Sequence, residues 1–440
     1  MSVKLNIAEF ARRRKELIAM MEPNSIAIVA TAEEKIRSRD THYHFRPDSD
    51  FYYLSGFVEP GAVLVLVPGR EHGEFVMFVR ERDREKEIWD GYRQGPEGVL
   101  ANYGAEDAFP IDDIDEILPG LLEGRERVYY SLGRDPDFDR RVMGWINTLR
   151  AKERSGAIPP GELLDLDHYL HDMRLFKSAA EVKLMRTAGQ IAADAHVRAM
   201  RAAKPGLYEY QLQAEIEHEF ARQGARFPAY ATIVGSGANG CILHYIENES
   251  RLEKGDLVLI DAGCEYQMYA ADITRTFPAS GKFTDAQRRI YDLVLASQLA
   301  AIAEIKPGNH WDAPHAAAVR VLTQGLVELG ILTGDVEQLI EEGGYREFYM
   351  HRTGHWLGID VHDVGDYKVA GNWRILEPGM YMTVEPGLYI SPDNTEVAEQ
   401  WRGIGIRIED DVLVTAEGCE VLTGGVPKTA DAIEALMAGE

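Results

Sequence analysis

Acidic and imidazole side chains at the ends of apolar runs are the feature of this sequence that most restricts its fold. The apolar run 257–260 ends at Asp261, and the run 381–384 ends at Glu385. A carboxylate at the mouth of a buried strand is costly unless a cation or a hydrogen-bond donor faces it. The fold must therefore gather such side chains around a compensating charge. Five residues are candidates for this group: Asp261, Asp272, His355, Glu385 and Glu409.

The segment around the first two acids predicts an antiparallel hairpin. We interpret Tyr266 and Gln267 as a two-residue turn, after which residues 268–276 return as a strand. A turn centred there places Asp261 and Asp272 directly opposite each other, with Cβ atoms about 5 Å apart. Two carboxylates that close repel each other unless a cation or a proton lies between them. A solvated pair on an exposed hairpin is the alternative, and the apolar flanks argue against it.

The segment 403–409 predicts a second strand that carries a ligand. Its isoleucines alternate with other residues, so Arg407 and Glu409 share the opposite face of the strand. Arg407 would then orient a ligand carboxylate, with an ordinary ion pair as the alternative. Asp410 and Asp411 are weaker candidate ligands, since a strand carries Asp410 on the isoleucine side.

Four histidines add candidates for binding and proton transfer: His351, His355, His362 and His244. A metal needs one or two of them, and the others could stabilise a developing oxyanion or carry protons. A hydrogen-bonded structural role is the alternative for any one histidine alone. Four carboxylates and one imidazole suit two Mn²⁺-like ions that share a bridging water. We therefore predict a dinuclear metallohydrolase.

Other chemistries find little support in the sequence. There is no HExxH helix, no Walker A loop and no GxSxG elbow. Cys241, Cys264 and Cys419 form no CxxC pair, and we expect buried or incidental thiols, with a nucleophile or a disulfide as alternatives.

Charge and hydropathy predict a soluble cytoplasmic protein. The 47 basic and 72 acidic residues give a net charge of −25, which disfavours nucleic acid and anionic membranes as partners. Residues 1–25 read as an amphipathic helix, with Phe10 and Leu17 on its apolar face and Arg13 and Arg14 between them. No run approaches the roughly 18 apolar residues of a membrane span.

The chain divides into two predicted domains, residues 1–175 and 176–440. The first is expected to be α/β, and Pro159, Pro160 and Gly161 then break the pattern, with residues 163–176 as a connecting segment. Its predicted strands are residues 26–30, 63–67, 75–79 and 128–131.

The second domain contains a weak internal repeat. Capped helices are predicted to begin at Ser178 and Thr284, and each ends at a Lys-Pro-Gly sequence, residues 204–206 and 306–308. A second helix and strand-rich segments follow in both cases. Chance placement of proline and glycine is the alternative. Two related halves would divide the ligands, with two acids from the first half and three ligands from the second.

The chain resembles, over essentially its full length, the bacterial Xaa-Pro aminopeptidase (aminopeptidase P) family of pita-bread metallopeptidases. Prolidase and methionine aminopeptidase share that fold. The segments that carry the resemblance are residues 50–57, 232–237, 242–245, 259–263, 272–278, 355–358, 383–387 and 405–410. The loop 352–354 is a place where relatives vary.

The resemblance implies a creatinase-like α/β N-terminal domain for oligomerisation and access to the active site. It also implies an α+β pita-bread catalytic domain with pseudo-two-fold symmetry. Asp272 and Glu409 would bridge two Mn²⁺ ions per subunit, with other divalent metals as alternatives. Asp261 would hold one ion, and His355 and Glu385 the other. A homotetramer is expected.

The implied substrates are peptides with proline in the second position. In this reading a metal-bridging hydroxide attacks the Xaa–Pro carbonyl carbon. His362 and the metals stabilise the oxyanion, Glu385 relays the proton, and His244 assists departure of the proline nitrogen. His351 would contact substrate, and Trp89 would reach a neighbouring subunit's active site.

Two alternatives remain at this point. Prolidase shares the ligands but cleaves Xaa-Pro dipeptides, so substrate length separates it from the aminopeptidase. A metal-free member of the fold, acting as a binding module or by creatinase-type chemistry, would lack ligands, and all five are present.

Overall fold

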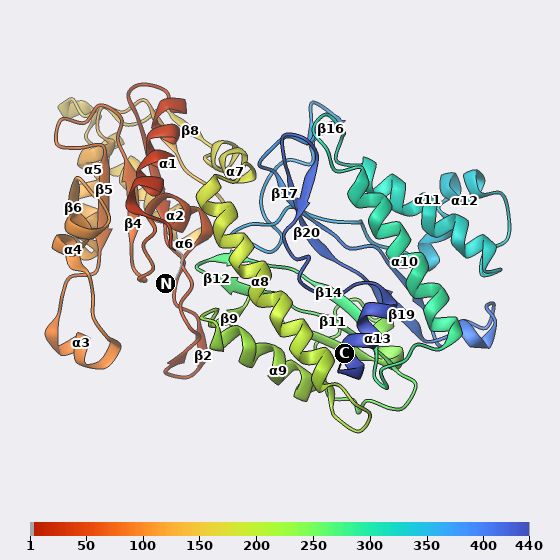
Figure 1. Cartoon of the computed structure of the whole chain (residues 1–440). Helices are drawn as coiled ribbons and strands as arrows, with labels where there is room; N and C mark the ends of the chain where they lie inside the picture. Colours follow the sequence, from red (N-terminus) through yellow and green to blue (C-terminus); the bar gives the residue numbers. More distant parts are fainter. Residues whose placement is uncertain (1–3, 440) are drawn as a thin grey trace. The chain divides into compact units, whose positions relative to one another are not determined.

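The computed structural model describes residues 4–439 and forms two compact units. One unit is Leu5–Met173, and the larger one begins at Arg174 (Figure 1). The division falls inside helix α7 (Asp167–Leu175). The segment 163–176, expected to be a connection, therefore contains regular structure.

The smaller unit is built on a six-stranded mixed sheet with the order β6-β5-β4-β1-β7-β8. Its strands are β1 (Ser25–Ala30), β4 (Val63–Leu66), β5 (Phe75–Val79), β6 (Asp107–Pro110), β7 (Arg127–Tyr129) and β8 (Glu162–Leu164). Its other elements are α1 (Ile7–Met20), β2 (Ile36–Ser38), β3 (Thr41–His42), α2 (Ser49–Ser55), α3 (Arg84–Asp90), α4 (Gly95–Asn102), α5 (Ile114–Leu122) and α6 (Pro136–Arg150). The four predicted strands are present. Two strands of the sheet were not predicted: β6, which pairs in parallel with β5, and β8, which pairs in parallel with β7.

Helix α1 forms as predicted, but two of its arginines are buried. Arg13 donates to the carbonyl of Tyr53 at 3.0 Å, and Arg14 donates to the carbonyl of Leu54 at 2.8 Å. Both carbonyls lie in the last turn of α2, where the helix dipole favours cations. The amphipathic pattern therefore underestimates what this helix buries.

The larger unit repeats one arrangement twice. In the first half, α8 (Ala179–Ala202) and α9 (Glu209–Arg222) precede a sheet with the order β10-β11-β14. In the second half, α10 (Asp285–Ala303) and α11 (Ala313–Glu328) precede a sheet with the order β17-β20-β21. Helix α8 packs on β12 and β13, and α10 packs on β19 (Figure 1). The predicted capping boxes at Ser178 and Thr284 are both formed.

The strands of the first half are β9 (Phe227–Pro228), β10 (Ile233–Ser236), β11 (Leu257–Asp261), β12 (Cys264–Tyr266), β13 (Tyr269–Ala270) and β14 (Thr274–Pro278). Those of the second half are β15 (Lys368–Val369), β16 (Asn372–Trp373), β17 (Tyr381–Val384), β18 (Gly387–Ile390), β19 (Ile404–Arg407), β20 (Asp410–Val414) and β21 (Cys419–Val421). Two further helices are α12 (Val336–Glu342) and α13 (Ala430–Ala438).

The predicted hairpin turn is wrong by one residue. Tyr266 pairs with Tyr269, so the turn residues are Gln267 and Met268, with φ values of 51° and 72°. Asp261 consequently lies opposite Thr274 instead of opposite the second acid. Moving the turn centre by one residue shifts the register by two. Because side chains alternate with a period of two, the acids still share a face.

The predicted strand 403–409 is interrupted where the ligand lies. β19 ends at Arg407 and pairs with β18, whereas β20 begins at Asp410 and pairs with β17. Glu409 occupies the junction between the two sheets. His355 was expected at a strand end but lies in an irregular segment, next to an isolated bridge between Trp356 and Met382.

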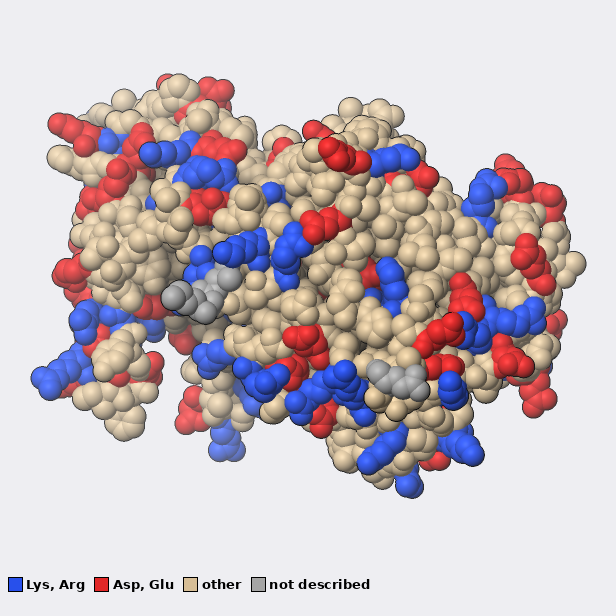
Figure 2. Space-filling view, in the orientation of Figure 1, with Lys and Arg blue, Asp and Glu red and all other residues tan. Residues whose placement is uncertain are grey.

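The three cysteines are free thiols, so the disulfide alternative is wrong. Cys264 is fully buried and the other two are partly buried. Across residues 4–439, no helix combines the length and the apolar character needed to cross a membrane. Acidic and basic side chains are interspersed on the face shown in Figure 2.

Gly263 provides a test of how tightly this hairpin is packed. A Cβ at Gly263 would lie 1.6 Å from the carbonyl oxygen of Ala271, which is backbone and cannot move aside alone. We expect Gly263→Ala to destabilise the fold by about 2–4 kcal/mol, since overpacking in a rigid site strains the backbone. Chemical unfolding measures the change. Gly418→Ala is the control, because no atom lies within 4 Å of that position, and an equal effect of both changes would contradict the prediction.

Candidate metal centre

The five predicted ligands line one cavity of about 760 Å³ in the larger unit. They come from both halves: Asp261 ends β11, Asp272 precedes β14, and Glu385 follows β17. Glu409 comes from the β19–β20 junction and His355 from the irregular segment. Strand ends and junctions point side chains out of the ladder, and this is how two separate sheets supply one site.

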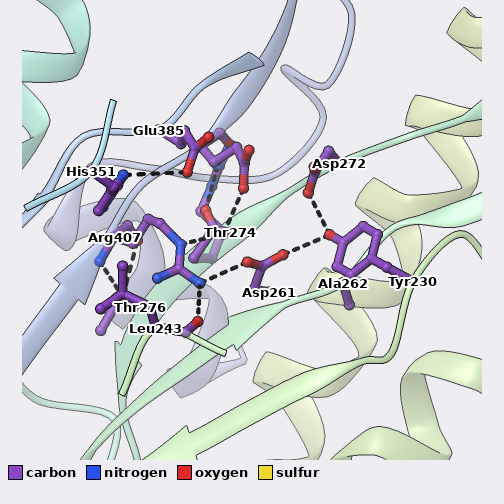
Figure 3. Close-up of polar contacts among 12 residues, drawn as sticks. Tyr230, Leu243, Asp261, Ala262, Asp272, Thr274, Thr276, His351, Glu385 and Arg407 are labelled. Atoms are coloured by element: carbon purple, nitrogen blue, oxygen red, sulfur yellow. Dashed lines mark hydrogen bonds and ion pairs between the residues drawn. The ribbon is translucent and has the colours of Figure 1, made fainter. Parts of the chain in front are cut away.

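Tyr230 links the two acids of the first half. Its phenol oxygen lies 2.6 Å from Asp261 Oδ1 and 2.5 Å from Asp272 Oδ1 (Figure 3). A phenol donates one proton, so it satisfies one carboxylate at a time and leaves the pair short of positive charge. Burial and the neighbouring carboxylates raise the pKa of Tyr230 well above its ordinary value, which keeps the phenol a donor.

Three ligands lie close enough to hold one ion. One donor atom each from Asp272, His355 and Glu409 lies within 4.8 Å of the others. His355 Nε2 is 3.5 Å from Asp272 Oδ2 and 3.7 Å from Glu385 Oε1. The imidazole and three carboxylates therefore converge on a common space.

The other nitrogen of His355 fixes the direction of its ring. Nδ1 lies 3.0 Å from the carbonyl oxygen of Trp356, to which it donates, so Nε2 faces the cavity, where it can bind a metal once it has lost its proton. Burial lowers the pKa of His355. The hydrogen bond to Asp272 and the nearby Glu385 outweigh burial and raise the pKa to about 9.

Arg407, which belongs to the second half, contacts ligands from both halves. Its Nη2 donates to Asp261 Oδ2 at 2.6 Å, and its Nε donates to Thr274 Oγ1 at 3.1 Å (Figure 3). Thr274 Oγ1 in turn donates to Glu409 Oε2 at 2.7 Å. Tyr389 accepts from Arg407 Nη1 at 2.9 Å. The arginine therefore orients one acid directly and contacts the hydroxyl that donates to another.

The remaining histidines lie at the cavity in different ways. His244 and His362 line it and are exposed. The rings of His362 and His355 are in edge-to-face contact, with their centroids 4.4 Å apart. His351 uses both nitrogens within the chain: Nδ1 lies 2.8 Å from the Arg352 carbonyl and Nε2 lies 2.8 Å from the Tyr389 hydroxyl. Burial lowers the pKa of His351 to about 4, so its ring is neutral.

The two acids after Glu409 point elsewhere. Asp410 accepts from Arg275 at 2.7 Å and from Lys428 at 2.8 Å, and these cations overcome burial and hold its pKa well below the usual range. Asp411 Oδ2 accepts from the backbone N–H of Asp272 at 3.1 Å. Neither lines the cavity, in agreement with their weaker standing as candidate ligands.

Burial raises the pKa of three carboxyl groups in the metal-free chain. It raises the pKa of Glu385 to about 7. Burial and the charge of Asp272 raise the pKa of Glu409 well above its ordinary value. Burial also raises the pKa of Asp272 itself, and Asp261 adds to this shift. A divalent cation would remove this repulsion by stabilising the ionised forms.

A second acidic group lies in the smaller unit, where Asp50, Asp167 and His171 could also hold an ion. Arg134 already occupies this place, with Nη1 2.7 Å from Asp50 and Nη2 2.8 Å from Asp167. The guanidinium supplies the positive charge that the carboxylates need. A metal fits the cavity of the larger unit better, since there four carboxylates gather around the guanidinium of Arg407, whereas Asp50 and Asp167 both pair with Arg134.

The donor set of that cavity fits divalent cations. Carboxylate oxygens and one imidazole nitrogen suit Mn²⁺-like ions, and the clustered carboxylates carry negative charge that the chain itself leaves uncompensated. Asp261, Asp272, His355, Glu385 and Glu409 would hold the ions.

Comparison with known proteins identifies the family. Residues 183–416 match metallopeptidase family M24, and residues 10–129 match the aminopeptidase P N-terminal domain. The Xaa-Pro aminopeptidase of Escherichia coli (strain K12) is 50% identical over 430 residues, which cover 98% of this chain and 97% of that protein. The chain therefore belongs to metallopeptidase family M24.

Solved structures show the same relationship. The structure of Pseudomonas aeruginosa aminopeptidase PepP has a TM-score of 0.99 and 62% identity, with 99% of both chains covered. A glutamate-to-alanine variant of Escherichia coli aminopeptidase P, in complex with substrate, has a TM-score of 0.97 and 49% identity, again with 99% of both chains covered. The predicted metallopeptidase class, and the N-terminal α/β domain followed by a pita-bread domain, are confirmed.

Several residues that hold the ligands carry no recognisable signal in the sequence. Tyr230 lies in a segment without periodicity, followed by Ala231 and Thr232 before a strand begins. No sequence pattern therefore indicates that its hydroxyl contacts two acids. Tyr389 and Thr274 lie within strands, where an aromatic or β-branched residue is ordinary. Their hydroxyls matter because they face acids, which only the fold reveals.

Metal binding should depend on pH. In the metal-free chain the pKa of Glu385 is raised to about 7 and that of His355 to about 9, so both carry protons in weakly acidic solution. A ligand must lose its proton to bind metal, so affinity should rise by at least about tenfold from about pH 6 to about pH 8. Titration calorimetry with Mn²⁺ measures this, and buffers of different ionisation enthalpy report the released protons. An affinity independent of pH would contradict the prediction.

Tyr230→Phe should weaken metal binding by about tenfold or more, because residues that orient metal ligands typically contribute this much. Removing the hydroxyl leaves Asp261 and Asp272 without their shared donor. Titration with Mn²⁺ measures the loss. Tyr291→Phe is the control, because this phenol is also buried but donates to the backbone carbonyl of Lys428. Equal losses in both variants would show that the effect is general.

Proposed function

We propose that this protein is a dinuclear-metal aminopeptidase that removes the first residue from peptides with proline in the second position. The convergence of five hard ligands in one cavity of the larger unit carries this proposal. The Xaa-Pro aminopeptidases to which the chain is similar along its whole length support the choice of substrate. We further propose Mn²⁺ as the metal, and peptides instead of nucleic acids or membranes as the molecules on which the protein acts.

Two divalent cations in the cavity would lower the pKa of a shared water and polarise the scissile carbonyl. Asp261, Asp272, His355 and Glu409 would hold the ions together with Glu385. Glu385 is proposed both as a ligand and as the group that accepts and passes on the proton of the attacking water. A bound cation would favour the ionised form of Glu385, which can accept that proton.

His362 and His244 are proposed as the histidines that act on the peptide. Burial and His355 lower the pKa of His362, so its neutral ring can donate an N–H to the oxygen that becomes negative. His244 lies on the cavity wall and is exposed, so it can reach the proline nitrogen and assist its departure. The nitrogen of an Xaa–Pro bond carries no N–H, and this distinguishes the substrate from other peptides.

His351 is proposed to contact substrate through the carbon edge of its ring, because both nitrogens have partners within the chain. Apolar side chains give the cavity surface for an aliphatic ring: Ile233, Trp311, Val361, Tyr367 and Trp373. Arg407 is proposed to act through Asp261, which it fixes at 2.6 Å.

The smaller unit is proposed to serve oligomerisation and access to the active site, with residues 1–175 as this domain and 176–440 as the catalytic domain. Trp89 lies on α3 and is 86% exposed, and Tyr92 beyond it is 90% exposed. Large aromatic side chains this exposed are typical of contact surfaces. We propose a homotetramer in which Trp89 reaches a neighbouring active site. The cytoplasmic location stays a prediction.

Substrate length tests the proposed activity against prolidase. The Mn²⁺-loaded protein should release the first residue from an Xaa-Pro-Xaa tripeptide and act weakly on an Xaa-Pro dipeptide. A dipeptide-specific site must hold a free proline carboxylate that the longer peptide lacks. Preference for the dipeptide would move the assignment to prolidase. Inertness toward both, with metal bound, would leave only the metal site standing.

Trp89→Ala should raise KM several-fold with little change in kcat, because an exposed side chain that only binds substrate contributes uniform binding. Steady-state kinetics on the tripeptide measure this, with Leu132→Ala, a change of another exposed apolar side chain, as the control. Mixing Trp89→Ala subunits with His355→Ala subunits tests action across subunits. Mixed oligomers should regain normal KM if Trp89 comes from the neighbour, and they should not if it acts within its own chain.

A further inference from the structure

The segment that carries His362 has almost no regular structure of its own. Residues 357–367 form neither helix nor strand, although they supply a side chain to the cavity. Backbone hydrogen bonds hold the ends of the segment: Leu357 N–H donates to the Tyr381 carbonyl at 3.1 Å, and Arg374 N–H donates to the Tyr367 carbonyl at 2.9 Å. Next to His362, Asp363 N–H donates to the Trp356 carbonyl at 2.9 Å. A side chain that acts on a reacting atom must be held to within about 0.5 Å. The side chains that anchor the residues next to His362 therefore matter to its position.

A buried group of charges lies directly behind His362. Asp363, the next residue, accepts from Arg174 Nη2 at 2.6 Å and from Lys177 Nζ at 2.8 Å. Arg174 Nη2 also donates to Asp360 Oδ2 at 2.7 Å. The side chains of Asp363 and Lys177 are each 1% exposed, and that of Arg174 is 2% exposed. Two acids from the irregular segment thus face two cations from the first residues of the larger unit.

The cations are themselves held in place. Lys177 Nζ donates to the Arg174 carbonyl at 2.6 Å, and the Lys177 backbone N–H donates to the Gly379 carbonyl at 2.8 Å. Gly358 makes room for the group, since a Cβ there would lie 2.0 Å from Asp363 Oδ2 and 3.0 Å from Lys177 Cε. Burial raises the pKa of Asp363, but Lys177 and Arg174 outweigh burial and lower it, so the carboxylate stays ionised.

Successive residues therefore face opposite ways. Asp363 points into a buried ion pair, while the His362 ring lies on the cavity wall, 4.4 Å from the His355 ring. Asp363, Arg174 and Lys177 are not among the residues that line the cavity within the described part of the chain. The charge group therefore acts on the cavity through the segment that it anchors, whose Asp363 N–H donates to the Trp356 carbonyl, the oxygen that also accepts from His355 Nδ1.

We propose that Asp363, fixed by Arg174 and Lys177, is a positioning residue that holds His362 toward the scissile bond. This inference depends on the role proposed above for His362. Asp363 touches neither substrate nor metal, so it acts by orientation alone. Residues that orient an active group commonly contribute about 10–100-fold.

A double-mutant cycle separates positioning from a general structural role. Asp363→Asn should lower kcat on the tripeptide by about tenfold or more while leaving Mn²⁺ affinity within about twofold. In a His362→Ala background the same change should cause no further loss of kcat, because the group that it orients is gone. The melting temperature should fall equally in both backgrounds, since the buried charges are disturbed in either case.

Glu219→Gln is the matched control. Glu219 is a buried acid on α9 that faces two arginines, Arg198 at 3.3 Å and Arg222 at 2.5 Å, and it does not line the cavity. The substitution Glu219→Gln should lower the melting temperature and leave kcat unchanged in both backgrounds. If Asp363→Asn fails to fold, Lys177→Met replaces it in the same cycle. That change keeps the ion pair between Asp363 and Arg174.

The outcomes are distinct. An equal fold-loss of kcat from Asp363→Asn with and without His362 would overturn the inference and leave the proposed role of His362 intact. An undiminished kcat in His362→Ala would remove the proposed role of the histidine itself, and the inference with it. Loss of Mn²⁺ affinity in Asp363→Asn would also overturn the inference, because the charge group would then act on the metal site.

Discussion

Mutual repulsion among four carboxylates in one buried cavity is the constraint on which the rest of this structure depends. Burial limits how far water can screen these groups, so each benefits from a hydrogen bond, an arginine or a metal ion. The chain supplies Tyr230, Thr274 and Arg407, which together cover only part of the negative charge. The remainder makes the cavity a place for cations. Stability and metal affinity are therefore linked, because ions that bind the folded chain also stabilise it.

Each half of the larger unit supplies part of the ligand set. The first half delivers two acids on one hairpin, and the second delivers the imidazole, two acids and the arginine. Neither half alone holds enough ligands for two ions. The contact of Arg407 with Asp261 joins them across the cavity, so the site exists only once both halves have folded together.

The chemistry of the site could be predicted from the sequence because an acid at the end of an apolar run is costly wherever it falls. The positions of turns, contacts and strand pairs were harder to predict. The turn at Gln267 and Met268 has two positive φ values without glycine or asparagine, so nothing marks it. Tyr230 lies 31 residues before Asp261, and sequence distance gave no reason to connect them. Strand β8 follows a proline-rich break that suggests a linker, and its pairing with β7 is visible only in the fold.

Glu409, Asp410 and Asp411 are adjacent acids with three different environments: the cavity, the pair Arg275–Lys428, and the backbone N–H of Asp272. Successive side chains of a strand point to opposite faces, so a register slip of one residue would carry each acid away from its own partner. The same slip would turn Val412 and Val414 out of the core. Hydrogen bonding and burial therefore select the same register here. A single inserted or deleted residue between Glu409 and Val414 would break both at once, so the length of this segment is as strictly constrained as the chemistry of its acids.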